Sequence, residues 1–216
     1  PLSAVNLINA DDDGNGVELN DHRAVELFSQ AHTLGYLAAT VNLGLMYEWG
    51  EGVKIDYMRA KELYLTAHEK HFPGGTFRLA EIFYYGIGIE PNEKKALNLF
   101  NMVAGDDFPD AYHYIGKIHH YGPDIDYVDA KKAYNIALGY DKKDIAVLVD
   151  LAWLEYKIGD WGLAKRRTEK ALEHLMFSEF YNIEEHIEVL INLGIIYSSL
   201  GLNDYSVSLY KTLLKL

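Results

Sequence analysis

Two groupings of histidine have the residue type that metal binding requires: His68 with His71, and the adjacent pair His119 and His120. A closed metal site needs three or four converging ligands. The chain has no cysteine and no H-E-x-x-H motif, and His68 and His71 straddle the expected end of a helix. We therefore interpret these histidines as amphipathic residues at the junctions between structural units, and we expect no metal ion and no cofactor.

The acidic segment NADDDGNGVELN, residues 9–20, partly resembles a calcium-binding loop. The positions of a D-x-D-x-D-G run are occupied by Asn9, Asp11, Asp13 and Gly14. The twelfth position holds Asn20 instead of the bidentate glutamate that completes such a loop, and this weakens or abolishes calcium binding. We favour a solvated acidic turn, with a calcium-responsive module as the alternative.

Catalytic patterns are missing from the sequence. The triplet GIG (86–88) could suggest a phosphate-binding loop, but no strand is expected before it and no GK[ST] follows it. Its counterparts GNG (14–16) and GEG (50–52) recur at a step of 36 residues, which indicates a repeated turn. No serine–histidine–acid or paired-carboxylate arrangement can be picked out. We predict that the protein is not an enzyme.

The charge balance excludes two classes of partner. The 216 residues carry 32 acidic and 20 basic side chains, for a net charge of −12. Nucleic-acid binders need a basic surface, which this acidic chain lacks overall. An anionic membrane surface disfavours binding of an acidic protein for the same electrostatic reason. The most apolar stretch (189–202) is shorter than the ~20 apolar residues of a membrane span. We expect no nucleic-acid binding and no membrane insertion, and the lack of cysteine suits a cytoplasmic or a periplasmic location equally. The basic run KRRTEK (165–170) is interpreted as a solvated helix face.

Internal repeats define the elements that must position any functional residue. A column of small residues contains Ala24, Ala60, Ala96, Ala130, Ala164 and Ser206. Four residues after each lies an aromatic column made of Phe28, Tyr64, Phe100, Tyr134, Thr168 and Tyr210. Upstream, a leucine column contains Leu43, Leu79, Ile115, Leu151 and Leu193. So many columns in one register indicate a repeat architecture.

Each repeat is predicted to form two helices. Apolar residues at 38–49 recur every three to four positions, GEGV (50–53) interrupts them, and the same period resumes at Ala60. The glycines are expected to supply backbone angles that a side chain would resist, and Pro73 and Pro109 suit helix starts. The fold class is therefore all-α, in one array of about six two-helix units. Their approximate bounds are 1–35, 36–71, 72–107, 108–140, 141–176 and 177–216.

Three segments carry a resemblance to a known family: LGLMYEWGEGVKIDYMRAKELYLTA (43–67), RLAEIFYYGIGIEPNEKKALNLFNMVA (78–104) and YIGKIHHYGPDIDYVDAKKAYNIALG (114–139). They resemble the Sel1-like repeat, a relative of the tetratricopeptide repeat. The segments 151–172 and 191–214 look more like plain tetratricopeptide repeats. The resemblance implies a right-handed α-solenoid whose first helices line a concave surface, and a function in binding other proteins.

In tetratricopeptide arrays, five positions around the leucine column tend to face the groove. The candidate partner-binding residues that follow are Asn42, Leu45, Glu48, Trp49, Arg78, Glu81, Tyr84, Tyr85, His113, Lys117, His120, Trp153, Tyr156 and Asn192. Asn42 and Asn192 match the asparagine that such domains use to hold a peptide backbone. Tyr84 and Trp153 are the expected anchors, because neither falls in a packing column. The alternative for any one tyrosine is that it packs neighbouring helices.

These observations predict a non-catalytic protein-interaction scaffold that binds a partner protein in its concave groove. The small acidic chain suits a bacterial immunity or inhibitor protein, or an adaptor, with a basic toxin or effector as partner. The alternative is a calcium-responsive or structural assembly module. Apolar residues crowd the last helix: Leu209, Tyr210, Leu213, Leu214 and Leu216. We expect a second copy (a homodimer through this helix), a partner or further residues to cover that end.

Overall fold

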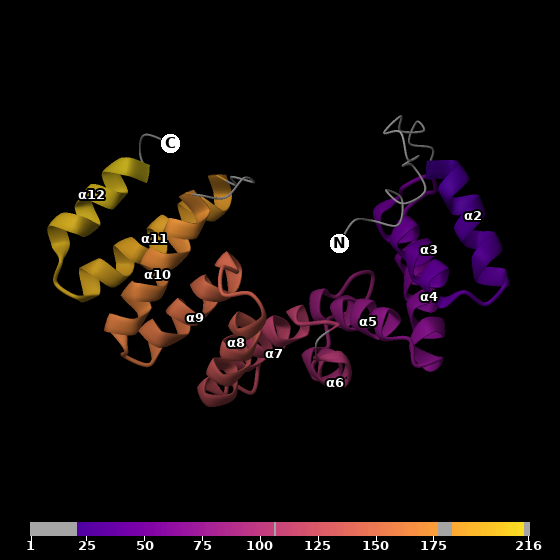
Figure 1. Cartoon of the computed structure of the whole chain (residues 1–216), viewed down its shortest axis with the longest axis horizontal. Helices are drawn as coiled ribbons and strands as arrows, with labels where there is room; N and C mark the ends of the chain where they lie inside the picture. The colour runs from indigo at the N-terminus through magenta and orange to yellow at the C-terminus, as the bar shows by residue number, and fades with distance from the viewer. Residues whose placement is uncertain (1–20, 106, 177–182, 214–216) are drawn as a thin grey trace. The chain divides into compact units, whose positions relative to one another are not determined.

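The computed structural model describes residues 21–105, 107–176 and 183–213, which form α-helices and no β-strand (Figure 1). The chain divides into two compact units, an N-terminal unit (Pro1–Phe108) and a C-terminal unit (Pro109–Leu216). The N-terminal unit contains α2 (Asp21–Thr33), α3 (Leu37–Trp49), α4 (Tyr57–Glu69), α5 (Pro73–Tyr85) and α6 (Glu93–Val103). The C-terminal unit contains α7 (Asp110–Tyr121), α8 (Tyr127–Tyr140), α9 (Ile145–Lys157), α10 (Trp161–Met176), α11 (Ile183–Ser199) and α12 (Asn203–Leu213).

The helices pair as the repeat predicts. α3 packs on α4, α5 on α6, α7 on α8, α9 on α10 and α11 on α12. Within each unit the first helices of neighbouring repeats also contact one another, α3 with α5, α7 with α9 and α9 with α11, more closely than the second helices do. The side formed by first helices is therefore the concave one within a unit. The all-α solenoid architecture is confirmed.

In three of the described repeats, a glycine on the first helix fits closely against a tyrosine ring on the second. Tyr64 and Tyr134 are fully buried, and their rings lie against the backbones of Gly44 and Gly116. A Cβ atom at Gly116 would come within 2.5 Å of the Tyr134 ring. The periodic small residues are therefore required for the helices to approach closely.

Helix ends follow from local residue chemistry. The second helices α4, α6 and α8 are each preceded by an N-cap residue whose side chain accepts hydrogen bonds from backbone N–H groups of the first turn: Asp56, Asn92 and Asp126. Pro73 begins α5, and Pro109 directly precedes α7.

The predicted role of the turn glycines holds for the longer turns only. Gly50, Gly86 and Gly88 have φ of 75°, 71° and 66°, in the left-handed region. Gly122, which follows Gly86 by the same step of 36 residues, instead has φ of −72° and ψ of −179°, so the expectation for the turn glycines was wrong at this position. The turn that contains it is two residues shorter, and it reaches α8 through extended backbone instead.

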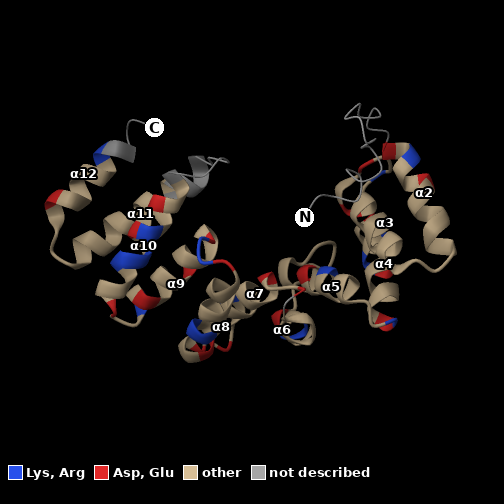
Figure 2. Cartoon of the chain, viewed as in Figure 1, with Lys and Arg blue, Asp and Glu red and all other residues tan. Residues whose placement is uncertain are grey.

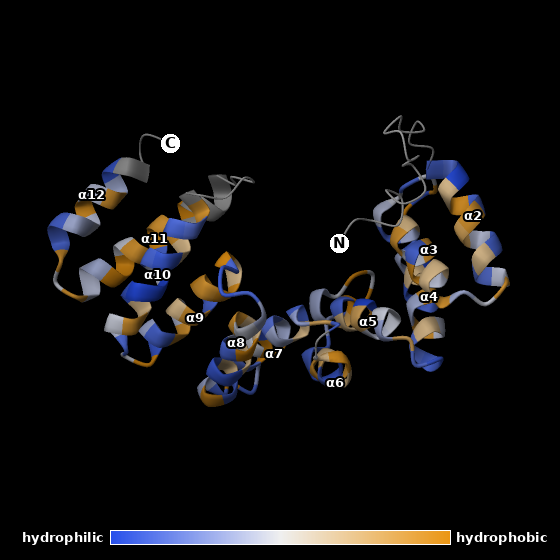
Figure 3. Cartoon of the chain, in the orientation of Figure 1, coloured by the Kyte–Doolittle hydropathy of each residue, from blue (hydrophilic) through white to orange (hydrophobic). Residues whose placement is uncertain are grey.

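The charged run 165–170 is only partly a solvated face. Figure 2 shows acidic and basic residues side by side along α10, and Figure 3 shows that α10 is more hydrophilic than α9. Arg167, however, turns inward: its Nε donates to Oε2 of Glu155 at 2.8 Å, and Glu155 is 0% exposed. The Nζ of Lys131 lies 3.5 Å from the other carboxylate oxygen. Arg167 therefore neutralises a buried acid, because a buried carboxylate needs a partner.

Candidate protein-binding face

The concave side of the C-terminal unit carries a hollow of about 150 Å³ between α7, α9 and α11. Its lining residues are His113, Lys117, Ile145, Ala146, Val149, Asp150 and Val189. The helical period places them there, since the residues before and after each leucine-column position point away from the second helix. The hollow combines apolar walls with one acid, one lysine and one histidine, which is a surface suited to a polypeptide segment.

A hydrogen-bond network holds Asp150 at the edge of this hollow. The Nε2 of His113 donates to Oδ2 of Asp150 at 2.7 Å, and the hydroxyl of Tyr121 donates to Oδ1 at 3.0 Å. Burial raises the pKa of Asp150, but these hydrogen bonds and the positive charges of His113 and Lys117 outweigh it, so the pKa lies below its usual value. Asp150 is therefore a fixed anion near neutral pH.

An aromatic platform lies further along α9. The rings of Trp153 and Tyr156 stack with centroids 5.2 Å apart, and the Nζ of Lys157 lies 5.0 Å above the Trp153 ring. The hydroxyl of Ser199 on α11 donates to the Tyr156 oxygen at 3.1 Å. These contacts orient large, partly exposed rings, which is how aromatic anchors are prepared at interfaces.

The N-terminal unit presents its own face on α3 and α5. Trp49 is 50% exposed and Tyr85 is 55% exposed. On the same two helices, Oε2 of Glu48 accepts a hydrogen bond from the Tyr64 hydroxyl at 2.8 Å, and Arg78 pairs with Glu81 at 2.8 Å. This face therefore joins exposed aromatic rings to a charged pair.

The structure distributes the fourteen predicted site residues over both units. Asn42, Leu45, Glu48, Trp49, Arg78, Glu81, Tyr84 and Tyr85 lie on α3 and α5; His113, Lys117 and His120 lie on α7; Trp153 and Tyr156 lie on α9; and Asn192 lies on α11. Within the part of the chain that the structure describes, the side-chain amides of Asn42 and Asn192 make no hydrogen bond.

Two of these predicted residues are tied to packing. His120 is 3% exposed; its ring stacks on Tyr121, and its Nδ1 lies 3.3 Å from the Tyr134 hydroxyl. In this structure its side chain is closed to a partner. Tyr84 meets the ring of Phe100, in the aromatic column, at 6.5 Å. Tyr84 itself stands in none of the packing columns, but this contact shows that the position five after the leucine column borders the second helix.

Ser199 is a residue that sequence reasoning missed. It stands six places after Leu193, one of the groove positions used for the other repeats, so extending the same rule would have found it. Its bond to Tyr156 joins residues 43 positions apart, which no local pattern reveals.

The predicted calcium segment, 9–20, lies outside the described residues. In the described ranges, no three His, Asp or Glu side chains converge in a way that could hold a metal ion. Likewise, no described helix has both the length and the apolar character to cross a membrane.

Comparison with known proteins places the chain among repeat proteins. The Sel1 repeat model matches residues 11–36, 37–70, 73–104 and 109–136, more than half of the chain. No curated protein matches the sequence significantly. A Sel1 repeat protein from Oxalobacter formigenes is similar in structure, with a TM-score of 0.71, 26% identity, and coverage of 96% of this chain and 83% of that one.

Two further solved structures share the fold. YrrB, a TPR protein with an unusual peptide-binding site, has a TM-score of 0.63 and 14% identity, over 86% of this chain and 89% of that one. The immunity protein Pa5087 from Pseudomonas aeruginosa has a TM-score of 0.51 and 17% identity, over 97% of this chain and 79% of that one. At these identities the likeness concerns the fold alone.

Proposed function

Because the chain belongs to the Sel1 repeat family, we propose that it is a non-catalytic scaffold that binds a partner protein on the concave faces of its units. Repeat arrays of this kind generally mediate contacts between proteins. The observation that carries the proposal is the platform of Trp153, Tyr156 and Lys157 beside the hollow at His113 and Asp150. It joins aromatic anchors to fixed charges, the composition that interfaces favour.

The chemistry of the partner follows from charge. The N-terminal unit has 16 acidic and 8 basic residues, and the C-terminal unit has 16 and 12, which gives −8 and −4. A basic partner is attracted to both units and more strongly to the first. Electrostatic attraction governs mainly the association rate, while the buried aromatics set the residence time.

Within this class we propose the narrower role of an immunity or inhibitor protein against a basic toxin or effector, with an adaptor as the other possibility. The acidic balance favours the first role, since an acidic surface can mask a basic active site. YrrB shows that a related fold binds peptide, and Pa5087 shows that an immunity protein can have this fold.

Affinity capture from cells, followed by mass spectrometry and binding measurements on the purified partner, tests the proposal. Trp153→Ala should weaken binding by about 2 kcal/mol, as loss of an interface anchor does. Trp161→Ala is the control, because Trp161 is an exposed tryptophan on the second helix α10. Tyr84→Ala tests the N-terminal unit in the same way. If Trp153→Ala and the unaltered protein bind the partner with equal affinity, the concave face is not the binding site.

The competing role, a calcium-responsive assembly module, makes a different prediction. Calorimetric titration with calcium should then give saturable binding that Asp11→Asn and Asp13→Asn abolish. The protein-binding scaffold predicts no such heat and a partner affinity that calcium does not change.

A further inference from the structure

Lys117 is a cation without a carboxylate partner in the hollow of the concave face. It lines the hollow together with His113 and Asp150, and its side chain is partly buried. Among the described residues, its Nζ makes no hydrogen bond and has no carboxylate oxygen within 4.0 Å. A partly buried charge is stabilised by a partner of opposite sign, and Lys117 has this interaction still to make.

Asp150 does not supply that partner, although its carboxylate lies in the same hollow. Its Oδ2 accepts a hydrogen bond from Nε2 of His113 at 2.7 Å, and its Oδ1 accepts one from the Tyr121 hydroxyl at 3.0 Å. Both oxygens are thus held by residues of α7. Lys117 acts on Asp150 only through its charge, by lowering the pKa of that carboxyl.

The same two helix positions in the N-terminal unit show how such a charge is neutralised elsewhere. One residue before and two residues after the leucine column, α5 carries Arg78 and Glu81, whose side chains pair at 2.8 Å. At the corresponding positions α7 carries Tyr114 and Lys117. The acid that α5 supplies within its own helix is therefore missing from α7.

The described charges around the hollow have the opposite sign to the chain as a whole. The adjoining platform adds Lys157, whose Nζ lies 5.0 Å above the Trp153 ring. Hollow and platform together hold two lysines and one aspartate, which sum to +1 with histidine neutral, whereas the whole chain carries −12. This part of the surface therefore favours an anionic group.

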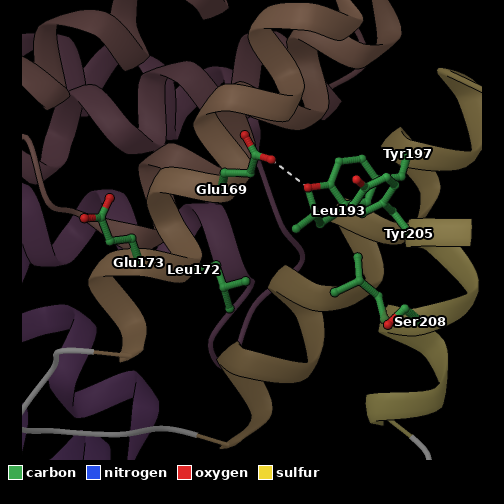
Figure 4. Close-up of a pocket in the computed structure, with 8 residues that line it drawn as sticks. Glu169, Leu172, Glu173, Leu193, Tyr197, Tyr205 and Ser208 are labelled. Atoms are coloured by element: carbon green, nitrogen blue, oxygen red, sulfur yellow. Dashed lines mark hydrogen bonds between the residues drawn. The ribbon is translucent and has the colours of Figure 1, made fainter. Parts of the chain in front are cut away.

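A second pocket of about 370 Å³, on the outer side between α10 and α12, has the reverse charge. Figure 4 shows Glu169 and Glu173 of α10 on one side of it and Tyr197 and Tyr205 on the other. Lys165 lies 3.7 Å from Oε1 of Glu169, so the two acids and this lysine leave one negative charge. An anionic ligand that distinguishes the two places therefore selects the smaller hollow.

We propose that the hollow binds the carboxylate of an aspartate or glutamate side chain in the partner protein, and that Lys117 holds it. The inference rests on the proposed function and specifies the segment that the partner presents: an acidic residue with apolar neighbours, which fit the walls formed by Ile145, Val149 and Val189. A partner that is basic overall is still attracted at long range, while the hollow selects its acidic residue at contact.

A side chain is favoured over the end of a chain because the binding surface continues beyond the hollow. Along α9 it extends from Asp150 to the platform of Trp153 and Lys157. A segment that contacts both places passes over the hollow and presents side chains to it.

Nuclear magnetic resonance titration of the whole chain with short capped peptides tests the proposal. The probes are acetyl-Leu-Glu-Leu-amide and acetyl-Leu-Gln-Leu-amide, which differ in one charge. The glutamate peptide should shift the backbone signals of Lys117, Val149 and Val189 saturably, with an affinity about tenfold higher than that of the glutamine peptide. The two peptides should not differ at Tyr197 and Tyr205. Equal affinities, or tighter binding of acetyl-Leu-Lys-Leu-amide at the hollow, would overturn the proposal.

A second pair of probes distinguishes the two sources of a carboxylate. Acetyl-Gly-Leu carries a free C-terminal carboxylate, and acetyl-Gly-Leu-amide does not. We expect both to bind the hollow more weakly than the glutamate peptide does. Tighter binding of acetyl-Gly-Leu would assign the hollow to a chain end and contradict the assignment to a side chain.

Substitutions identify Lys117 as the group that holds the carboxylate. Lys117→Gln should lower the affinity for the glutamate peptide about tenfold, to that of the glutamine peptide, and Lys117→Arg should keep most of it because the charge remains. Lys132→Gln is the matched control, since Lys132 is exposed on the second helix α8 and its loss changes the net charge equally. Undiminished binding by a Lys117→Gln variant that circular dichroism shows to be folded contradicts the assignment.

The two proposals fail separately. If Trp153→Ala weakens partner binding while the glutamate and glutamine peptides act alike, the scaffold function stands and the carboxylate site is wrong. If the glutamate peptide binds through Lys117 but Trp153→Ala leaves the affinity for the captured partner unchanged, the carboxylate site stands and the proposed use of the concave face is wrong.

Discussion

The ring of Tyr134 lies so close to the backbone of Gly116 that a Cβ at residue 116 would come within 2.5 Å of two ring carbons. The ring is fully buried, so it cannot move into solvent to make room. The same close approach joins Gly44 to the buried Tyr64 and Gly194 to Tyr210, which is 38% exposed. It explains why the first helix keeps a glycine where the second helix has a tyrosine.

We expect Gly116→Ala to lower the free energy of unfolding by about 1–2 kcal/mol, because overpacking outweighs the gain in helix propensity. Chemical denaturation measures the change. Gly139→Ala on α8 is the control, since a Cβ there meets no atom within 4 Å, and it should be neutral or stabilising. Similar behaviour of the two variants would show that the contact with Tyr134 is not restrictive.

Arg167→Ala should destabilise the C-terminal unit by about 3 kcal/mol, because it leaves the carboxylate of Glu155 buried with Lys131 as its remaining cation. Arg166→Ala, the exposed neighbour, should cost little. The double variant Glu155→Met with Arg167→Leu should recover most of the loss, because no buried charge remains. A loss that persists in the double variant would mean that packing by the arginine, not charge, is what matters.

His120 should make stability depend on pH between about 4 and 6.5. Burial lowers its pKa to about 4, with a further lowering by the charge of Lys157 and an opposing effect of Asp150. Across this window the unfolded chain binds a proton that the folded chain does not, so the free energy of unfolding falls as pH falls, by up to about 3 kcal/mol. His120→Gln should flatten the dependence in denaturation series, whereas His22→Gln, on an exposed site of α2, should leave the slope unchanged.

Gly88→Val should lower stability by about 1 kcal/mol or more. The residue has φ of 66°, and a Cβ would approach Cβ of Tyr57 to 2.6 Å. A Tyr57→Gly background removes the contact with that Cβ but not the backbone strain, so part of the loss should remain when the double variant is compared with Tyr57→Gly alone. An unchanged denaturation midpoint would show that residue 88 tolerates any side chain.

Most of the fold could be predicted because each column places the same type of residue at the same position of every repeat. Leu43, Ala60 and Tyr64 recur in register, and the helices and their pairing follow from that spacing alone. The candidate face was less predictable. His120 and Tyr121 are adjacent and both aromatic, and the groove rule applies to both, yet one is buried and the other is half exposed. The difference depends on the Tyr134 hydroxyl, fourteen residues away.

The sequence by itself determined an acidic, all-α repeat array, because a repeat period of about 36 residues can be read directly from the order of the residues. Only the tertiary structure decided which charges are buried and which inter-repeat gaps are filled. Arg167 looks like any lysine or arginine of a solvated helix until Glu155 and Asn135, from two other helices, are seen around it. Leu209 looks like a core leucine until the open pocket beside it is seen. Such places are formed by side chains from three helices, and the spacing of these residues in the sequence does not indicate that they come together.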